Sequence, residues 1–187
     1  MKPIENLKAE HEEILLMIDV LERMSEKITS CESVETDDLK QVLNFFEVFA
    51  DKCHNGKEEN YLFAALNEAG VPESGDLVAA MLSEHSRGHG FIEEMKSLLK
   101  SYEKGETGFV MVFTTPALQY INLLRSHIWK EDVVLFAMAE KALPADKLGL
   151  LAQQFEGFEN EEIGRETRKT FHETMEKLSK IYLQGEC

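Results

Sequence analysis

Apolar residues recur every three or four positions along most of the chain, the spacing that places side chains on one face of an α-helix. Four long stretches show this pattern, at about residues 4–28, 39–65, 78–102 and 117–138. Gly70 follows the second stretch and Pro144 follows the fourth, as expected at helix ends. The pattern predicts an all-α fold, an up-and-down antiparallel four-helix bundle. The start of its fourth helix stays open, because residues 109–113 could be extended and Thr115-Pro116 suits a helix start.

Residues 144–187 form a C-terminal helical extension, which follows a bundle expected to occupy residues 1–143. Apolar spacing within the extension predicts a short helix and then a longer one. We expect the extension to pack on the bundle or on a partner subunit. A homo-oligomer is therefore one arrangement that the sequence allows.

Charge narrows the classes of partner. The chain has 35 acidic and 20 basic residues and a formal net charge of −15, which argues against nucleic acid or an anionic membrane as a partner. No apolar run approaches the roughly 20 residues of a membrane span, and the N-terminus lacks an apolar signal core. The three cysteines form no metal-binding pair and suit reduced thiols. We therefore expect a cytoplasmic protein.

Polar side chains interrupt the four apolar stripes. The first stripe contains His11 alone, and the others carry pairs spaced by four residues, namely His54 and Glu58, His85 and His89, and His127 and Glu131. Four residues are about one helical turn, so both members of a pair project from one face and can hold the same ion. In antiparallel neighbours, groups at similar distances from a shared turn lie at one level. The sequence thus predicts one buried cluster.

The residue types of this cluster indicate a metal centre. Burying so many titratable groups would cost several kcal/mol each unless cations satisfied them together. Five imidazoles and two carboxylates are too many for one tetrahedral zinc, and the absence of cysteine from the set argues against an iron–sulfur cluster. Two six-coordinate ions that share both carboxylates and one oxygen-derived bridge leave six positions. The histidines fill five of them, and one stays open for a small molecule.

Two segments of the chain also correspond to each other. Residues 54–63 and 127–136 match at the histidine, lysine, glutamate, leucine and phenylalanine positions. Two halves of a four-helix bundle related by approximate symmetry would produce this correspondence.

The order of the motifs, with Asp132 after Glu131 and Leu-Phe after both glutamate motifs, resembles the hemerythrin-like (HHE cation-binding) family over roughly residues 4–143. The resemblance implies a four-helix bundle around a non-haem centre of two iron ions that binds dioxygen or a related small molecule. It implies that Glu58 and Glu131 bridge the two irons. It further assigns one iron to His85, His89 and His127, and the other iron, with the open position, to His11 and His54.

One of the two bridging residues has an alternative. Oxygen-carrying members of the family place the last carboxylate five residues after its histidine, here Asp132, whereas many bacterial relatives use four, here Glu131. Four residues leave about 40° between two side chains around a helix and five leave about 140°, so the spacing favours Glu131. Some relatives also lack a histidine at the position of His89.

Three functions are compatible with such a centre. The leading one is a protein that binds or senses dioxygen, nitric oxide or peroxide at an open iron position. The second is a di-iron enzyme that reduces peroxide or nitric oxide, or that donates iron for cluster repair. The third is a metal-dependent regulatory or interaction module whose C-terminal helices move with the metal state. The sequence shows no motif for a second redox cofactor, which favours binding over catalysis.

Overall fold

The computed structural model describes residues 2–70, 77–104 and 109–184, and every regular element in them is a helix. In chain order they are α1 (Pro3–Thr29), α2 (Thr36–Asn44), η1 (Phe45–Asn55), η2 (Glu58–Leu62), α3 (Phe63–Glu68), α4 (Leu77–Glu103), α5 (Phe109–Lys130), η3 (Glu131–Leu135), α6 (Phe136–Ala142), α7 (Ala145–Glu162) and α8 (Gly164–Tyr182). The expected all-α fold is confirmed. No helix in these ranges is both long and apolar enough to cross a membrane.

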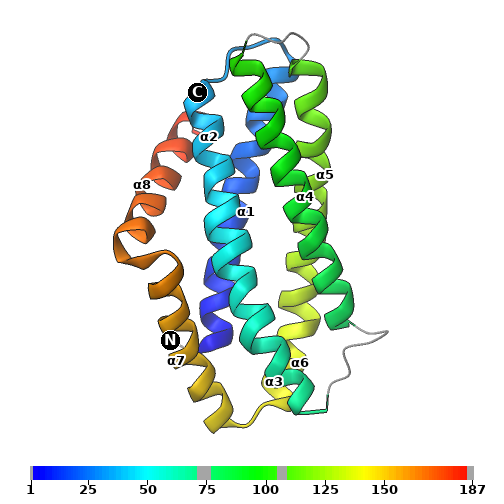
Figure 1. The fold of residues 1–187 in the computed structure, drawn as a ribbon, viewed down its shortest axis with the longest axis vertical. Coiled ribbons are helices and arrows are strands. Elements are labelled where there is room, and N and C mark those ends of the chain that lie inside the picture. Colours follow the sequence, from blue (N-terminus) through cyan, green and yellow to red (C-terminus); the bar gives the residue numbers. More distant parts are fainter. Residues whose placement is uncertain (1, 71–76, 105–108, 185–187) are drawn as a thin grey trace.

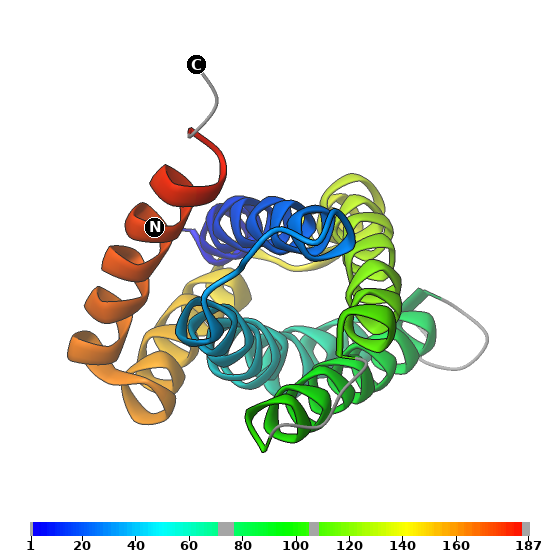
Figure 2. The same ribbon diagram turned by 90° about the horizontal axis from the view of Figure 1, so that it is seen from above.

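The helices form a bundle around a common core. Figure 1 shows that α2, η1, η2 and α3 follow one another as a single rod, and that α5, η3 and α6 form a second rod. In the same view α1 and α4 run upward, whereas these two composite rods run downward. Contacts link α1 to α5, α5 to α4, α4 to η1, and η1 back to α1. The rods therefore surround a common interior, and Figure 2 shows this arrangement of the helices from above.

Buried side chains divide this interior into three layers. One apolar cluster includes Ile14 on α1 and Ile92 on α4, and a second includes Leu7 on α1 and Met81 on α4. Between the two clusters lie the buried polar residues Glu10, His11, His54, Lys57, Glu58, His85, His127 and Glu131. All four rods thus contribute polar groups to one level, as the sequence predicts, and apolar side chains cover this level above and below.

π-helical turns occur at the same place in both composite rods. The segment η2 begins at Glu58, and η3 begins at Glu131. A π-turn holds an extra residue compared with an α-turn and often marks a functional site. The two rods therefore share a local distortion as well as the motif that runs from histidine to phenylalanine.

The fourth rod begins earlier than Thr115-Pro116. The helix α5 starts at Phe109, and Pro116 lies inside it. Proline removes one backbone hydrogen bond from a helix interior. The buried side chains of Phe113 and Ala117, on either side of this site, pack into the core and offset that loss.

The C-terminal helices pack along one edge of the bundle. Figure 1 shows α7 and α8 beside α1 and α2, and contacts link α7 to α1, η1 and η2, and α8 to α1. Phe171 on α8 packs edge-on against Phe45, and the Tyr182 hydroxyl donates a hydrogen bond to Asp38 at 2.9 Å. Lys177 donates to the same carboxylate at 2.7 Å. Both apolar and polar contacts therefore attach α8 to the bundle.

We expect Leu178→Ala to lower the free energy of unfolding by about 2–5 kcal/mol, because Leu178 is wholly buried against the bundle and its removal leaves a cavity. Ile181→Ala on the same helix is the control, since that side chain is 47% exposed and its loss should cost about 0.5 kcal/mol or less. Denaturant unfolding followed by circular dichroism measures both values. Similar losses in the two variants would contradict the packing of α8.

Candidate metal centre

Six of the residues named from the sequence come together in the polar layer. His11 and His54 form one group with Glu58 and Glu131, and His85 and His127 form a second group with the same two glutamates. Within each group, one ligand atom from each residue lies within 4.8 Å of the others, and all six residues are buried. Each group could hold a metal ion, and the two groups share both glutamates.

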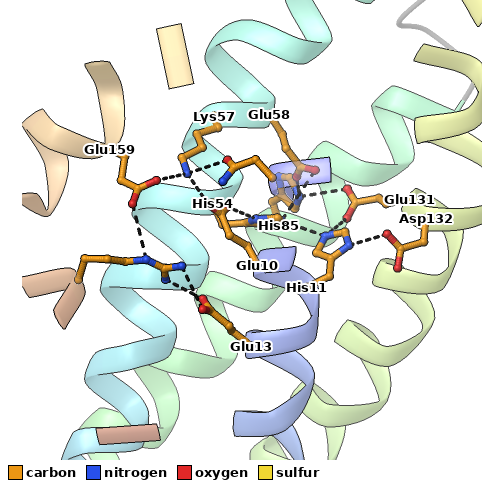
Figure 3. Close-up of polar contacts among 12 residues, drawn as sticks. Glu10, His11, Glu13, His54, Lys57, Glu58, His85, Glu131, Asp132 and Glu159 are labelled. Carbon is orange, nitrogen blue, oxygen red and sulfur yellow. Dashed lines mark hydrogen bonds and ion pairs between the residues drawn. The ribbon is translucent and has the colours of Figure 1, made fainter. Parts of the chain in front are cut away.

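The histidine Nε2 atoms face one another across the centre. The Nε2 atoms of His11 and His54 are 3.0 Å apart, and those of His85 and His127 are also 3.0 Å apart. Figure 3 shows part of this arrangement, with His11, His54, His85, Glu58 and Glu131 pointing toward a common region. Donor atoms at such short mutual distances are arranged as they would be around a shared cation.

Each glutamate directs its two oxygens toward different histidine pairs. Glu131 Oε2 lies 3.2 Å from His11 Nε2, and its Oε1 lies 3.2 Å from His127 Nε2. Glu58 Oε1 lies 3.8 Å from His54 Nε2, and its Oε2 lies 3.4 Å from His85 Nε2. A carboxylate in this orientation can bridge two ions.

The glutamate oxygens provide a test of whether cations suit this site. All four carboxylate oxygens of Glu58 and Glu131 are buried and accept no hydrogen bond from any described residue. Buried polar atoms without a partner are rare, and buried charges are tolerated where cations accompany them. Imidazole and carboxylate donors without cysteine suit first-row transition metals. The residues present therefore fit bound metal ions.

A carboxylate lies behind each of the four histidines. His11 Nδ1 donates to Asp132 at 2.9 Å, and His54 Nδ1 donates to Glu10 at 2.9 Å. His85 Nδ1 donates to Glu59 at 2.7 Å, and His127 Nδ1 donates to Glu84 at 2.9 Å. Such bonds fix the ring orientation and leave Nε2 free for a metal. Asp132, the alternative bridging residue, thus supports a histidine and lies outside both groups. Sequence analysis missed the other three partners, although each directly precedes or follows a residue of the two groups.

In each histidine pair, one of the carboxylates that accept from Nδ1 also accepts a hydrogen bond from a lysine. Lys57 donates to Glu10, and Lys130 donates to Glu84. These lysines directly precede Glu58 and Glu131 in the two matching motifs. The two halves of the centre therefore repeat the same sequence of contacts, from histidine to carboxylate to lysine.

The structure does not bring His89 to the cluster, which corrects its expected position. Its side chain is 56% exposed, and its Nδ1 lies 2.8 Å from Asp51 Oδ2. The inward line of α4 runs through the buried residues His85, Gly88 and Ile92. His89 follows Gly88 by one residue, or about 100° around the helix, and therefore lies beside this inward line.

The carboxylates favour positive charge at the centre. Burial lowers the pKa of His11, but the neighbouring carboxylates of Asp132 and Glu131 outweigh it and raise this pKa to about 10. Burial likewise opposes protonation of His85, while Glu58 and Glu59 raise its pKa to about 10. In the absence of metal, His11 and His85 thus hold protons where cations would otherwise bind.

A small cavity adjoins the four histidines. It has a volume of about 20 Å³, and its lining includes the apolar side chains of Ile14, Ile92 and Leu124 as well as Gly88. His89 and Asp51 also border it, and His89 is the exposed member of that pair. A cavity of this size holds a molecule about as small as water.

Comparisons with known proteins agree with this geometry. The model of the hemerythrin HHE cation binding domain matches residues 2–139, which include every residue of the two metal-binding groups. This match confirms the resemblance that the motifs indicate. A comparison with curated proteins gives no match. Since the family match covers most of the chain, the protein belongs to the hemerythrin HHE cation binding domain family.

Proposed function

We propose that the protein holds a non-haem di-iron centre and uses it to bind or sense dioxygen or a related small molecule such as nitric oxide or peroxide. The observation that carries this proposal is the convergence of four histidine Nε2 atoms on four buried carboxylate oxygens that have no hydrogen-bond partner among the described residues. One iron would be held by His11 and His54 and the other by His85 and His127, with Glu58 and Glu131 bridging. When bound, the irons would supply coordination positions and a change of oxidation state.

The revised ligand set changes how many coordination positions remain. Without His89, each ion would receive two imidazoles and one oxygen from each glutamate. A six-coordinate ion that also shares an oxygen-derived bridge would keep one further position. The proposed centre therefore has an open position on both sides, and both histidine pairs line the cavity.

The surrounding residues would select the ligand and support the histidines. The cavity of about 20 Å³ accommodates a small molecule and excludes larger substrates. The carboxylates at Nδ1 hold the imidazole rings in place, and the two apolar clusters exclude bulk water. We also propose that residues 1–143 constitute the up-and-down antiparallel four-helix bundle of the family and that residues 144–187 are its extension.

Two variants on one helix test the ligand set. His85→Ala should reduce the iron content from two ions per chain to one or fewer, because His85 faces both glutamates. His89→Ala, one turn along α4, should keep two ions. Metal analysis, with optical spectra of the anaerobically reduced protein before and after air, measures the effect. Equal losses in both variants would contradict the proposed set, and a wild-type protein that binds less than one iron would contradict the di-iron centre.

The raised pKa values of His11 and His85 predict how stability depends on pH. A histidine pKa raised in the folded state stabilises the metal-free protein fully below its ordinary value of 6.5, and this contribution is lost as the pH rises through about 10. The metal-free protein should therefore lose stability between pH 7 and 10. Apparent iron affinity should rise over the same interval, because fewer protons compete for the imidazoles. Unfolding and metal titrations at several pH values measure both, and an affinity that falls would contradict the assignment.

Two glycines on α4 test the role of the cavity. Gly88→Ala adds a methyl group that would lie 3.5 Å from Tyr120, an ordinary contact within the cavity lining. Gly90→Ala is the control, since its methyl group would meet no atom within 4 Å. Both changes should raise stability by about 1 kcal/mol through helix propensity. Only Gly88→Ala should slow binding of dioxygen or nitric oxide to the iron-loaded protein, as measured by stopped-flow absorbance. Unchanged binding would exclude this cavity as the ligand site.

A further inference from the structure

We propose that the C-terminal helices make the two metal positions unequal, because Glu159 of α7 anchors the hydrogen-bond chain at His54 and thereby retains the ion at His11 and His54, a contact that the described residues do not provide at the other position. This inference rests on the proposed function, since it requires that both positions bind iron. It identifies Lys57 and Glu159 as positioning residues that act on His54. The ion at His85 and His127 should leave first.

The two proposed metal positions have the same chain of contacts from the histidine to the lysine. His54 donates to Glu10, which accepts a hydrogen bond from Lys57. On the other side of the centre, His127 donates to Glu84, which accepts a hydrogen bond from Lys130. A difference between the positions must therefore arise from contacts beyond the lysines.

Only Lys57 is held from outside by the extension. Its Nζ also donates to Glu159 on α7 at 2.7 Å, and its side chain is 0% exposed. The side chain of Lys130 is 25% exposed, and among the residues that the structure describes it pairs with Glu84 alone. Figure 3 shows the connection from Glu159 through Lys57 and Glu10 toward His54.

A second set of contacts fixes Glu159 in place. Arg168 on α8 binds Glu13 of α1 through two nitrogens, at 2.6 and 3.1 Å, and its Nε lies 3.6 Å from Glu159 Oε1. The same guanidinium lies over the ring of Phe49, 4.4 Å from its centroid. Both C-terminal helices thus contribute to the contacts that close this side of the centre.

The residue that precedes each lysine determines whether α7 can approach that half of the metal centre. Gly56 precedes Lys57, and a Cβ atom placed on it would lie 2.7 Å from two ring carbons of Phe158 on α7. The corresponding position before Lys130 is Trp129, whose side chain is 60% exposed. A large side chain at Gly56 would prevent α7 from reaching Lys57, so this glycine is a condition for the asymmetry.

The hydrogen-bond chain should slow metal release because His54 must turn away from its ion before the ion departs. The hydrogen bonds that Glu10 accepts from His54 and Lys57 oppose this turn, and Glu159 prevents the lysine from moving aside. Loss of a partner behind a metal-binding histidine typically changes metal affinity by about 10-fold to 100-fold. We expect an effect near the lower end, since Glu159 acts through two intervening groups.

The test is the release of iron from the loaded full-length protein into excess chelator, followed by absorbance. The wild-type protein should release its two ions in a fast and a slow phase. Glu159→Gln should accelerate the slow phase about tenfold and leave the fast phase unchanged. Glu156→Gln is the matched control, because Glu156 is an exposed glutamate on the same helix. Acceleration of both phases, of the fast phase alone, or of neither would overturn the inference.

Two further variants test whether the slow phase of iron release comes from the ion at His11 and His54. Gly56→Trp, which copies the residue of the second half, should make the slow phase as fast as in Glu159→Gln. His127→Gln should remove the fast phase and keep a slow phase that still responds to Glu159→Gln. Circular dichroism of the metal-free variants shows whether each one folds. A wild-type protein without two bound irons would refute the di-iron proposal itself, whereas two irons released at equal rates would refute only the asymmetry.

Discussion

The structure depends on the burial of Glu58 and Glu131 at the centre of a helical bundle. Their four oxygens accept no hydrogen bond from the described residues, so their charges need cations close by. The four histidines place nitrogen atoms toward these oxygens, where either protons or metal ions can neutralise them. All four rods must therefore meet at this level, and the apolar clusters lie above and below it.

Charge alternates outward from this centre. Histidines surround the two glutamates, a second set of carboxylates accepts from the histidine Nδ1 atoms, and Lys57 and Lys130 neutralise two of those carboxylates. Hydrogen bonding to His54 and Lys57 outweighs burial and lowers the pKa of Glu10 to about 2, so this carboxylate stays charged behind its histidine. Each layer thus orients the layer inside it.

The two halves of the bundle repeat these layers, and the C-terminal helices break the repeat. The composite rods share both the motif from histidine to phenylalanine and the π-turn that starts at each glutamate. The extension adds Glu159 to one half, where Gly56 leaves space for α7, while the bulky Trp129 stands at the other. Differences between the two metal positions would therefore arise from packing outside the repeated core.

The sequence alone determined the helices, because helical periodicity is local and fixes which neighbours share a face. By the same reasoning it predicted that the candidate metal-site residues lie at one level and favoured Glu131 over Asp132. It could not determine the direction of His89. The residues three and four positions after His85 can both share its face of the helix. In the structure it is Gly88, three positions on, that faces the core, and His89 is exposed. Nor could it pair Lys57 with Glu159, which lie 102 residues apart. Such contacts depend on how whole helices pack, and only the tertiary structure sets that.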